Sequence, residues 1–370
     1  MKLLWITNIP SPYRVDFFNE LGKSCELTVL FEKAGAEDRD SSWQTFSPIN
    51  FEAIVLRSLS YSAESAASLG VLTHLRKGLY DAIVVTNFAS PTGALAIAYL
   101  KATGRRYCLE SDGGFPSGSR IKSWVKRHVI GGAQAYFSTS DVHDKYYLAY
   151  GAAPHQLIRY PFTSVRAADV LPEPPTAAQK MAAKRRIGVT KPKMVLSVGQ
   201  FIHRKGYDLL LEACSSLRDD TMVCIVGGEP PVEYRRIVSD LGLSNVLFSG
   251  FKQREQLGMY FTAADVFVHP SREDIWGLVV NEALAHALPV ITTDRCVAGH
   301  ELVARNGCGI VVPTESADVL EHALHKLLDD NELRNRMQRR ALAISQNYTI
   351  EQMAERHRSV FEMATRGDHK

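Results

Sequence analysis

The sequence predicts an α/β protein with two domains, each built on a doubly wound parallel sheet. Short apolar runs recur along the chain and alternate with helical patterns, which is typical of parallel strands joined by helices. The chain has 370 residues, enough for two domains of ordinary size. A proline-rich and then basic stretch at residues 161–190 interrupts the alternation, and we interpret it as the link between the domains.

Composition and charge indicate a soluble globular protein. Apolar residues make up 45% and charged residues 22% of the chain. A net charge of +3 is too small to indicate a nucleic-acid partner. The six cysteines have neither C-x-x-C nor metal-ligand spacing, so we expect a reducing, cytoplasmic compartment and no metal site. The sequence shows no signal-peptide pattern and no apolar run long enough for a membrane span.

The first domain is predicted over residues 1–165. Strands are expected at residues 3–6, 27–31, 82–86, 107–109 and 135–138, and helices at 92–102 and 141–150. Residues 32–62 are less periodic and are predicted as loops, with a strand near Ile54. Ser11 and Pro12 are typical of a helix start. Arg14 would then lie in a first turn, where the helix dipole disfavours a cation, so we expect it to contact a ligand; the alternative is a surface arginine.

The second domain is predicted over residues 190–349. Its strands are expected at residues 194–198, 222–226, 246–248, 266–269, 290–293 and 310–312. After Ala317 the sequence is nearly all helical, and a last helix at about residues 350–366 is expected to pack back on the first domain. Ligands of such sheets bind at the carboxyl ends of the strands, and two facing domains would leave a cleft between them.

Loops that follow the strands of the second domain suit a nucleotide. Gly199 follows the first strand, and Arg204 and Lys205 come later in the same loop, where a diphosphate would need positive charge. The spacing is neither that of a P-loop nor G-x-G-x-x-G. Gly227 ends the next strand and permits close approach to a ring or ribose. Phe251 ends another strand and could pack against a base. The alternative for the two cations is a solvated basic turn.

Residues 271–293 place two acids around a predicted helix start. Asp274 is expected in a loop that turns at Gly277, and Glu282 lies inside the helix that follows. The free N–H groups and the dipole at such a helix start suit a phosphate. Asp274 could bind hydroxyl groups beside that phosphate, and Glu282 could bind others deeper in. The alternative is an N-capping acid followed by a solvated helix glutamate.

The order of these motifs resembles glycosyltransferase family 4. The chain carries V-G-x-x-x-x-R-K-G, V-G-G, S-G-F and H-P-S-x-x-D-x-W-G-x-x-x-x-E-A between residues 194 and 312. The resemblance implies an α/β protein of the GT-B fold, with two facing Rossmann-like doubly wound domains and an interdomain cleft. It also implies a retaining enzyme that moves a sugar from a nucleotide diphosphate sugar, with a UDP-sugar favoured and a GDP-sugar possible. The acceptor would be a glycan or lipid-linked saccharide in surface polysaccharide or glycolipid biosynthesis, and neither metal nor another cofactor would be required.

The resemblance also implies roles for individual residues. Arg204 and Lys205 would hold the diphosphate, Asp274 would bind the donor sugar and Glu282 the ribose. The backbone between the two acids would support sugar and phosphate, at Ile275, Trp276, Gly277 and Leu278. Asp274 stands where glutamate is common in the family and Trp276 where phenylalanine is frequent, so we expect a reshaped sugar pocket.

The first domain departs further from the family pattern. The glycine-rich first loop is absent, and Ser11, Tyr13 and Arg14 stand there as candidate acceptor contacts. Related enzymes often carry a histidine in the loop near residues 110–114, close to the reacting carbon. Here Asp112 or Glu110 would take its place, and Asp112 is the catalytic candidate together with Arg204, Lys205 and Asp274. The alternatives are a turn aspartate and a helix-capping acid.

Residues 113–140 contain no acid and predict an amphipathic helix. Four cations, Arg120, Lys122, Lys126 and Arg127, accompany apolar residues at helical spacing, Ile121, Trp124, Val125 and Val129. Such a pattern is typical of a helix on an anionic membrane surface. The alternative is a core-packed helix with a solvated basic face.

Three functions remain open on these residues. The first is the retaining transferase. The second is a non-catalytic nucleotide-sugar binder, suggested by the missing loop histidine and the change from glutamate to aspartate. The third is a nucleotide-sugar 2-epimerase of the same architecture. All three require Arg204, Lys205 and Glu282.

Overall fold

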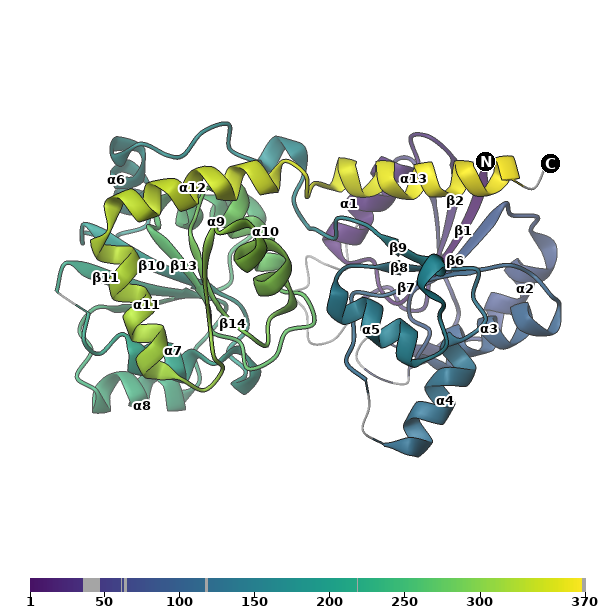
Figure 1. Ribbon diagram of the computed structural model, residues 1–370, viewed down its shortest axis with the longest axis horizontal. Helices are drawn as coiled ribbons and strands as arrows, with labels where there is room; N and C mark the ends of the chain where they lie inside the picture. Colours follow the sequence, from purple (N-terminus) through teal and green to yellow (C-terminus); the bar gives the residue numbers. More distant parts are fainter. Residues whose placement is uncertain (36–46, 61, 63–64, 117–118, 218, 368–370) are drawn as a thin grey trace. The chain divides into compact units, whose positions relative to one another are not determined.

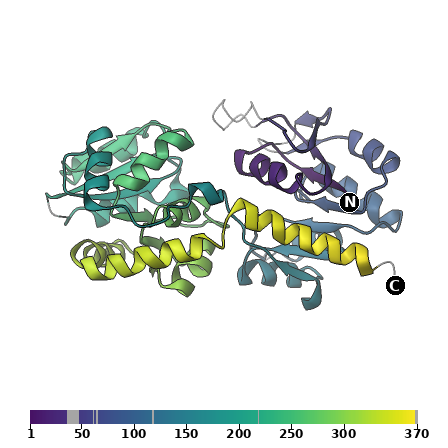
Figure 2. The same ribbon diagram turned by 90° about the horizontal axis from the view of Figure 1, so that it is seen from above.

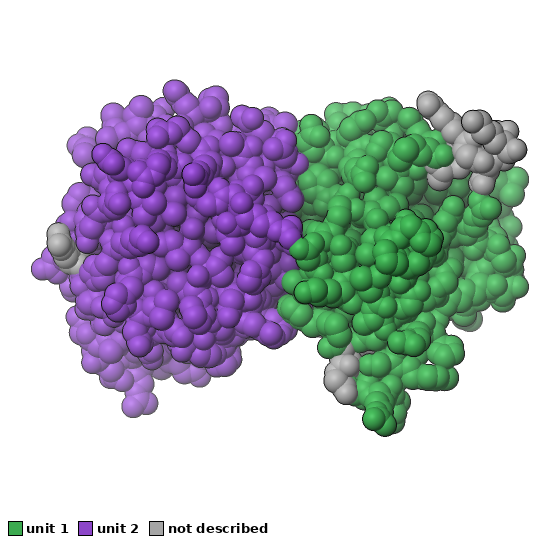
Figure 3. Space-filling view, in the orientation of Figure 1, with its two compact units in different colours: residues 1–163, 349–370 green, residues 164–348 purple. Residues whose placement is uncertain are grey.

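The chain forms two compact units in a computed structural model that describes residues 1–35, 47–60, 62, 65–116, 119–217 and 219–367. Unit 1 consists of Met1–Thr163 and Thr349–Lys370, and unit 2 of Ser164–Tyr348 (Figure 3). Each unit is a sheet covered by helices on both faces (Figure 1). In the described part of the chain, no helix combines the length and the apolar content needed to cross a membrane.

The sheet of unit 1 has seven parallel strands in the order β3-β2-β1-β6-β7-β8-β9. Its strands are β1 Lys2–Thr7, β2 Glu26–Phe31, β3 Glu52–Val55, β6 Ala82–Val85, β7 Cys108–Glu110, β8 Ala135–Ser138 and β9 Leu157–Arg159. A separate antiparallel pair joins β4 Leu59–Ser60 to β5 Ala66–Ala67. The strand order reverses between β1 and β6, which is the topological switch point of a doubly wound sheet.

Helices pack on both faces of this sheet because apolar side chains alternate along β1. Leu4 and Ile6 point into a core shared with α2, α3 and α5. Trp5 points the other way and contacts Phe17 and Phe361, from α1 and α13. The helices of unit 1 are α1 Pro12–Leu21, α2 Gly70–Lys77, α3 Pro91–Ala102, α4 Arg120–Ile130, α5 Asp141–Ala149 and α13 Ile350–Gly367, with a short 3-10 turn, η2, at Pro154–Gln156. The C-terminal helix α13 packs against α1 (Figure 2).

Unit 2 has a six-stranded parallel sheet in the order β12-β11-β10-β13-β14-β15. Its strands are β10 Lys193–Val198, β11 Thr221–Val226, β12 Val246–Ser249, β13 Val266–His269, β14 Val290–Thr293 and β15 Gly309–Val312. Numbered within the unit, the order is 3-2-1-4-5-6, that of a Rossmann fold, with the switch point between β10 and β13. The predicted α/β fold class is confirmed, and the strands predicted at residues 266–269 and 290–293 match β13 and β14.

The helices of unit 2 also cover both faces of its sheet. On one face, α7, α8 and α11 share a core with the strands. On the other, α6 packs against α9 and α10 against α12. The elements are 3-10 turns η3 Ala167–Asp169 and η4 His203–Lys205, helices α6 Ala177–Arg186, α7 Tyr207–Ala213, α8 Val232–Asp240, α9 Arg254–Ala263, α10 Leu278–Ala285, α11 Ala317–Asp329 and α12 Asn331–Ser345, and a π-helical turn, η5, at Gly299–Ala304.

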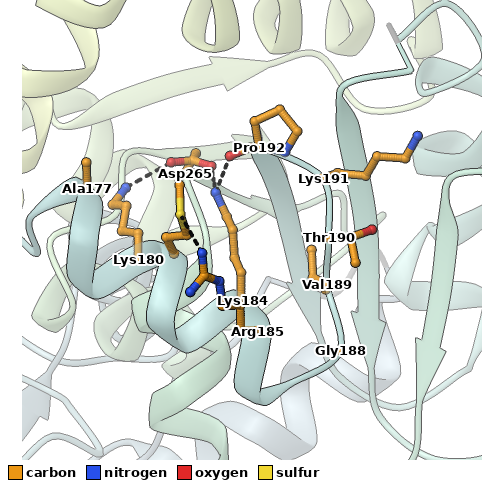
Figure 4. A pocket seen from close by; sticks show the side chains of 11 residues that line it. Ala177, Lys180, Lys184, Arg185, Gly188, Val189, Thr190, Lys191, Pro192 and Asp265 are labelled. Atoms are coloured by element: carbon orange, nitrogen blue, oxygen red, sulfur yellow. Dashed lines mark hydrogen bonds and ion pairs between the residues drawn. The ribbon is translucent and has the colours of Figure 1, made fainter.

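Helix α6 lies in the stretch that we expected to be the link between domains, and it is part of unit 2. Lys180 donates to Asp265 over 3.1 Å, and Lys184 donates to the other oxygen of that carboxylate over 2.8 Å (Figure 4). Burial lowers the pKa of Lys180. Burial alone would raise the pKa of Asp265, but the charges of the two lysines hold it below its ordinary value. These lysines line a cavity of about 510 Å³, and their ammonium groups attach α6 to the sheet. The basic stretch therefore has a structural role here.

Candidate active site

The predicted phosphate residues and the first acid of unit 2 lie together at the switch point of its sheet. Arg204 and Lys205 are in the turn η4 that follows β10, and Asp274 is in the loop that follows β13. The Lys205 ammonium donates to Asp274 Oδ2 over 2.6 Å, and Arg204 Nη1 lies 3.7 Å from the same oxygen. The Arg204 guanidinium also donates to the carbonyl of Glu273 over 2.7 Å. Residues 70 positions apart in the chain thus form one cluster.

Arg204 reaches the surface more than the carboxylate does, whereas Lys205 is about as buried as Asp274. The side chain of Arg204 is 47% exposed and that of Lys205 15%, whereas Asp274 is 13% exposed. A lysine ammonium has three N–H donors, and Lys205 directs one of them at Asp274. The cluster can therefore present positive charge and free donors to an anion.

His269, the last residue of β13, contacts Asp274 from inside unit 2. It was not among the predicted site residues. Its buried imidazole donates from Nε2 to Asp274 Oδ2 over 3.0 Å. Burial and the charge of Lys205 lower the pKa of His269, so the neutral ring makes this bond. Burial alone would raise the pKa of Asp274, but His269 and Lys205 hold it well below its ordinary value. A polar residue at the carboxyl end of a predicted strand was the signal available in the sequence.

Arg272 joins the two loops of the cluster and was also not predicted. Its guanidinium donates to both carboxylate oxygens of Asp208, over 2.8 and 2.7 Å. It also donates to the carbonyl of His203 over 2.9 Å and pairs with Glu315. The Arg272 backbone N–H donates to the carbonyl of Arg204 over 2.8 Å. These contacts of Arg272 hold the turn η4, which carries Arg204 and Lys205, the two candidates for phosphate binding.

Two glycines of the second unit are required by their surroundings. Gly277 opens α10 with a φ of 98°, in the left-handed region that a side chain disfavours. A Cβ at Gly227 would lie 1.7 Å from the carbonyl oxygen of Gly199, so the loops after β10 and β11 touch through backbone alone. At the start of α10, the N–H groups near Leu278 have no partner within the helix, as at every helix N-terminus.

The side chains around Gly277 point in different directions. Trp276 is 2% exposed, and its indole N–H donates to Asn281 Oδ1 over 2.8 Å. Its ring packs against Tyr348 in the interior of unit 2. The Trp276 side chain is therefore part of the packing of unit 2, whereas we expected it to reshape a sugar pocket. Ile275, next to it, is 41% exposed.

Glu282 lies on α10 at a separate cavity of about 250 Å³. Ser164 donates to Glu282 Oε1 over 2.9 Å. Burial raises the pKa of Glu282, against the opposing effects of Ser164 and Arg254. The alternative of a solvated helix glutamate is therefore wrong. The cavity is also lined by Arg166, Asp169, Arg254, Phe261 and His286.

Phe251, after β12, is 49% exposed and presents its ring to solvent.

In unit 1 the structure separates the two acids that were candidates for the histidine position. Glu110 is fully buried, whereas the side chain of Asp112 is 45% exposed. Arg14 pairs with both carboxylates, and its contact with Asp112 Oδ1 measures 2.6 Å. Tyr13 donates from its hydroxyl to Asp112 Oδ2 over 2.9 Å. Asp112 is thus the acid that can meet a ligand.

The acceptor candidates at the start of α1 are less open than we expected. Arg14 is 4% exposed, so it is an internal partner of the two acids rather than a surface contact. Ser11 is 6% exposed and precedes Pro12, the first residue of α1. Burial and the charge of Asp112 raise the pKa of Tyr13, which keeps its hydroxyl protonated as a donor. Tyr13 and Arg14 both contact the exposed carboxylate of Asp112, and Tyr13 is the less buried of the two.

Ser111, next to Asp112, forms a pair with His143 that superficially resembles a nucleophile and its base. The Thr139 backbone N–H donates to His143 Nδ1 over 3.3 Å, so the proton of the neutral ring is on Nε2. Nε2 then donates to Ser111 Oγ over 2.8 Å. Burial lowers the pKa of His143 to about 3. The ring therefore cannot take a proton from Ser111 in this arrangement.

Within the described ranges, no group of three or more His, Cys, Asp or Glu residues could hold a metal ion.

Helix α4 presents apolar side chains to solvent. Ile121 is 78% exposed, Trp124 63% and Val125 47%. Ile130 is the one buried residue of the helix. Figure 1 shows α4 projecting from the body of unit 1. Ile121, Trp124 and Val125 are thus solvated, whereas Val129, at the end of the same face, packs against the core of unit 1.

Comparison with known proteins agrees with this architecture. Residues 180–343 match the family model described as glycosyl transferases group 1. The lipopolysaccharide glucosyltransferase WaaG of Escherichia coli is 35% identical over 147 residues, which cover 38% of this chain and 38% of that protein. A GDP-mannose-dependent alpha-(1-6)-phosphatidylinositol monomannoside mannosyltransferase of Mycolicibacterium smegmatis is 34% identical over 168 residues, covering 42% of this chain and 43% of that protein. The chain thus matches less than half the length of each of these two relatives.

A solved structure extends the similarity in fold to nearly the whole chain. The crystal structure of Anabaena HepE in complex with UDP and glucose covers 98% of this chain and 100% of that chain, with a TM-score of 0.76 and 16% identity. Such a low identity shows the fold alone, which is the GT-B fold of two Rossmann-like domains. The second unit is therefore similar in sequence to glycosyltransferases, and the whole chain has the GT-B fold.

Proposed function

We propose that this protein is a retaining glycosyltransferase of family 4 that uses a nucleotide diphosphate sugar, with UDP as the favoured nucleotide. The observation that carries the proposal is the cluster of Arg204, Lys205 and Asp274 at the switch point of unit 2. A doubly wound sheet binds its ligand at that point, and the exposed cations suit a diphosphate. The complex of HepE with UDP and glucose supports a UDP-sugar, and the mannosyltransferase relative keeps GDP open.

The donor is held by residues from several loops of unit 2. Arg204 and Lys205 bind the diphosphate oxygens, while Gly199, Gly227 and the N–H groups at the start of α10 allow close backbone contact. Asp274 accepts hydrogen bonds from hydroxyl groups of the sugar. Glu282 binds the ribose, and the exposed ring of Phe251 packs on the base. Ile275 to Leu278 contribute backbone groups between sugar and phosphate.

The chemistry is a front-face displacement that keeps the anomeric configuration. The bond between the anomeric carbon and the diphosphate oxygen breaks, and the acceptor oxygen forms its bond on the same face. The departing phosphate takes the acceptor's proton, while Arg204 and Lys205 stabilise the negative charge that develops on it. These two cations supply the charge that leaving-group stabilisation needs, so we propose that transfer requires no metal and continues in the presence of EDTA.

Unit 1 supplies the acceptor side of the proposal. Asp112 is a partly exposed carboxylate held by Tyr13 and Arg14, and it accepts a hydroxyl hydrogen of the sugar or the acceptor. It orients that group and forms no bond to carbon. The WaaG relative supports a lipid-linked saccharide as the acceptor class, in surface polysaccharide or glycolipid synthesis.

Proton NMR of the first product formed tests the proposal. The purified protein is incubated with an α-linked UDP-sugar and a cell-extract acceptor, and the anomeric signal of the new linkage is recorded. We expect an α product, and no covalent sugar–protein adduct in the Asp112→Asn variant. A β product would contradict the retaining mechanism and most of the family assignment.

The two alternative functions make different predictions in the same experiment. A non-catalytic binder would leave the donor intact, with neither transfer nor hydrolysis. A 2-epimerase would release a sugar inverted at C2 without needing any acceptor. Transfer that depends on added acceptor therefore distinguishes the proposed function from both.

We further propose that α4 binds unit 1 to an anionic membrane surface at the cytoplasmic face. Its exposed apolar residues Ile121, Trp124 and Val125 accompany the basic residues Lys122 and Arg127, which are also exposed. Apolar side chains enter the interface, and each cation near an anionic surface contributes about 1 kcal/mol. A protein bound to the membrane through α4 would have access to a lipid-linked acceptor.

Vesicle sedimentation tests the membrane proposal. We expect the protein to bind vesicles that contain phosphatidylglycerol, and charge reversal at Lys122, Lys126 and Arg127 to reduce the bound fraction by at least tenfold. Charge reversal at exposed Arg236 and Arg339 on unit 2 is the control and should leave binding unchanged. Equal sedimentation of the α4 variant and the wild type would contradict the proposal.

A further inference from the structure

The C-terminal helix contributes a buried histidine to the carboxylate cluster of unit 1. His357, on α13, is fully buried, and its Nε2 lies 3.2 Å from Glu110 Oε2. Its Nδ1 donates to the backbone carbonyl of Met353 over 2.8 Å. A carbonyl and a carboxylate only accept hydrogen bonds, so His357 is the donor in its contact with Glu110.

The surroundings of this imidazole are aromatic. Phe137 is stacked on His357 with ring centroids 4.3 Å apart, and Tyr160 and Phe17 lie at 4.8 and 5.0 Å. Trp5 is at 5.7 Å. These rings hold the imidazole in one orientation. The contact with Glu110, the last residue of β7, is therefore fixed by packing around His357.

From Glu110 the contacts continue to the exposed carboxylate. The buried Arg14 uses one terminal nitrogen for Glu110 and the other for Asp112 Oδ1. Burial alone would raise the pKa of Glu110, but the charge of Arg14 and the bond from His357 keep that pKa low. Glu110 is therefore an anion that holds the Arg14 guanidinium in place. Asp112 is thus oriented by a fixed arginine on one oxygen and by Tyr13 on the other.

We infer that His357 and Glu110 are positioning residues for Asp112, acting through Arg14. The chain of contacts runs from α13 to β7, then to the first turn of α1, and ends at the loop after β7. None of the inner members needs to reach a ligand, since His357, Glu110 and Arg14 are all at most 4% exposed. Their combined effect is to present one carboxylate at a defined angle. The inference rests on the proposed function, because Asp112 matters only if it meets a sugar or an acceptor.

The chain of contacts gives the C-terminal segment a role in the chemistry. Thr349 begins the part of unit 1 that returns after unit 2, so the last helix completes a cluster begun at residue 14. Removing His357 would leave Glu110 with Arg14 alone, and removing Glu110 would free the arginine to rotate. Either change would loosen Asp112 without touching the phosphate cluster of unit 2. We therefore expect kcat to fall while nucleotide affinity stays constant.

A double-mutant cycle on kcat tests the inference. We expect Glu110→Gln to lower kcat by roughly tenfold or more, as loss of a charge-assisted hydrogen bond would, with the Kd for UDP unchanged. In the Asp112→Asn background, the same Glu110→Gln change should lower kcat by less than twofold, because the group on which it acts is already gone. A merely structural role of Glu110 would lower kcat by the same factor in both backgrounds.

Two variants at His357 extend the test in case Glu110→Gln does not fold. His357→Gln keeps an N–H donor and should retain most of the wild-type kcat, whereas His357→Leu removes the donor and should lower it several-fold. Arg358→Ala, at the neighbouring exposed position, is the control. Equal kcat in the Gln and Leu variants would overturn the inference. If Asp112→Asn itself leaves kcat unchanged, the role of Asp112 in the proposed function fails; equal factors in both backgrounds overturn the positioning inference alone.

Discussion

Both units build their clusters at the carboxyl ends of parallel strands, with opposite charge facing outward: after β10 and β13 in unit 2, and after β1 and β7 in unit 1. Both sheets reverse strand order once, at β1 and β6 in unit 1 and at β10 and β13 in unit 2. In unit 2 the cation is outside, with Arg204 47% exposed and Asp274 13% exposed. In unit 1 the carboxylate is outside, with Asp112 45% exposed and Arg14 4% exposed.

This inversion shows how one fold serves two kinds of ligand. An outward cation with an inner carboxylate suits phosphate oxygens, while the inner acid keeps the cation in place. An outward carboxylate with an inner arginine suits hydroxyl groups, which donate hydrogen bonds to it. The strand order sets where a ligand can bind, and the order of charges from core to surface sets which ligand it is.

The largest effect is expected from removing the outward cations of unit 2. Arg204→Ala and Lys205→Ala should each lower kcat/KM for transfer by about 10²–10³-fold, since each loses a contact to developing negative charge. Thermal unfolding should change little in Arg204→Ala, whose side chain is 47% exposed, whereas Lys205→Ala should lower stability because it removes a partner of the largely buried Asp274. Arg236→Ala, at an exposed ion pair of the same unit, is the control. Near-normal turnover in the Arg204→Ala/Lys205→Ala double variant would show that the phosphate assignment is wrong.

A smaller effect is expected from neutralising the outward acid of unit 1. Asp112→Asn keeps the shape and removes the charge, so we expect kcat to fall by about 10- to 100-fold, the equivalent of one hydrogen bond to a charged group. Steady-state kinetics with the donor at saturation would measure this loss. Asp240→Asn on the surface of unit 2 serves as the reference. An unchanged kcat would contradict a role of unit 1 in the transfer reaction.

The two acids of unit 2 should differ in which ligand they affect. Glu282→Ala should weaken binding of free UDP by about tenfold, because the ribose is part of that ligand. Asp274→Ala should leave UDP binding nearly unchanged and lower kcat/KM for the sugar donor. Calorimetric titration with UDP, alongside turnover with the UDP-sugar, separates the two effects. Equal loss of UDP affinity in both variants would refute this division of roles.

The smallest effect is on stability, and it depends on pH. Burial raises the pKa of Glu282, so the ionised carboxylate destabilises the folded state above that raised pKa. This destabilisation of the folded state decreases as the pH falls through the raised pKa of Glu282. It disappears below the pKa that Glu282 has in the unfolded chain. Glu282→Gln should therefore stabilise the protein by about 0.5–1 kcal/mol at pH 7 and by nothing near pH 4. Urea unfolding at the two pH values measures this, and an equal gain at both would contradict burial as the cause.

Sequence patterns predicted the sheets well because buried parallel strands are continuous apolar runs. The strand predicted at residues 135–138 is β8, and the strand expected near Ile54 is β3. Arg204, Lys205 and Asp274 were predicted to follow strands of one domain, and the structure groups them after β10 and β13. Their grouping needs only that neighbouring strands end at one edge of the sheet.

Burial and partner choice could not be predicted. Arg14, in the first turn of α1, and Asp112, in the loop after β7, both follow strands of the same sheet, yet one is internal and the other exposed. That difference depends on Glu110 and on His357, which comes 247 residues later in the chain. Helix α6 was interpreted as part of a linker because a proline-rich and then basic stretch interrupts the alternation there, and the partner of its lysines, Asp265, is far along the sequence. Ion pairs between residues far apart in the sequence produce no periodic pattern, so periodicity cannot predict them.

Calorimetric titration of UDP into three proteins tests the contrast between the units most directly. The wild type, the Arg204→Ala/Lys205→Ala variant and the Asp112→Asn variant are measured in the same buffer at low salt. Outward cations in unit 2 predict that UDP affinity falls by about 100-fold or more in the double variant and stays at the wild-type value in Asp112→Asn. Wild-type affinity in the double variant, or a comparable loss in Asp112→Asn, would contradict the assignment of phosphate binding to unit 2.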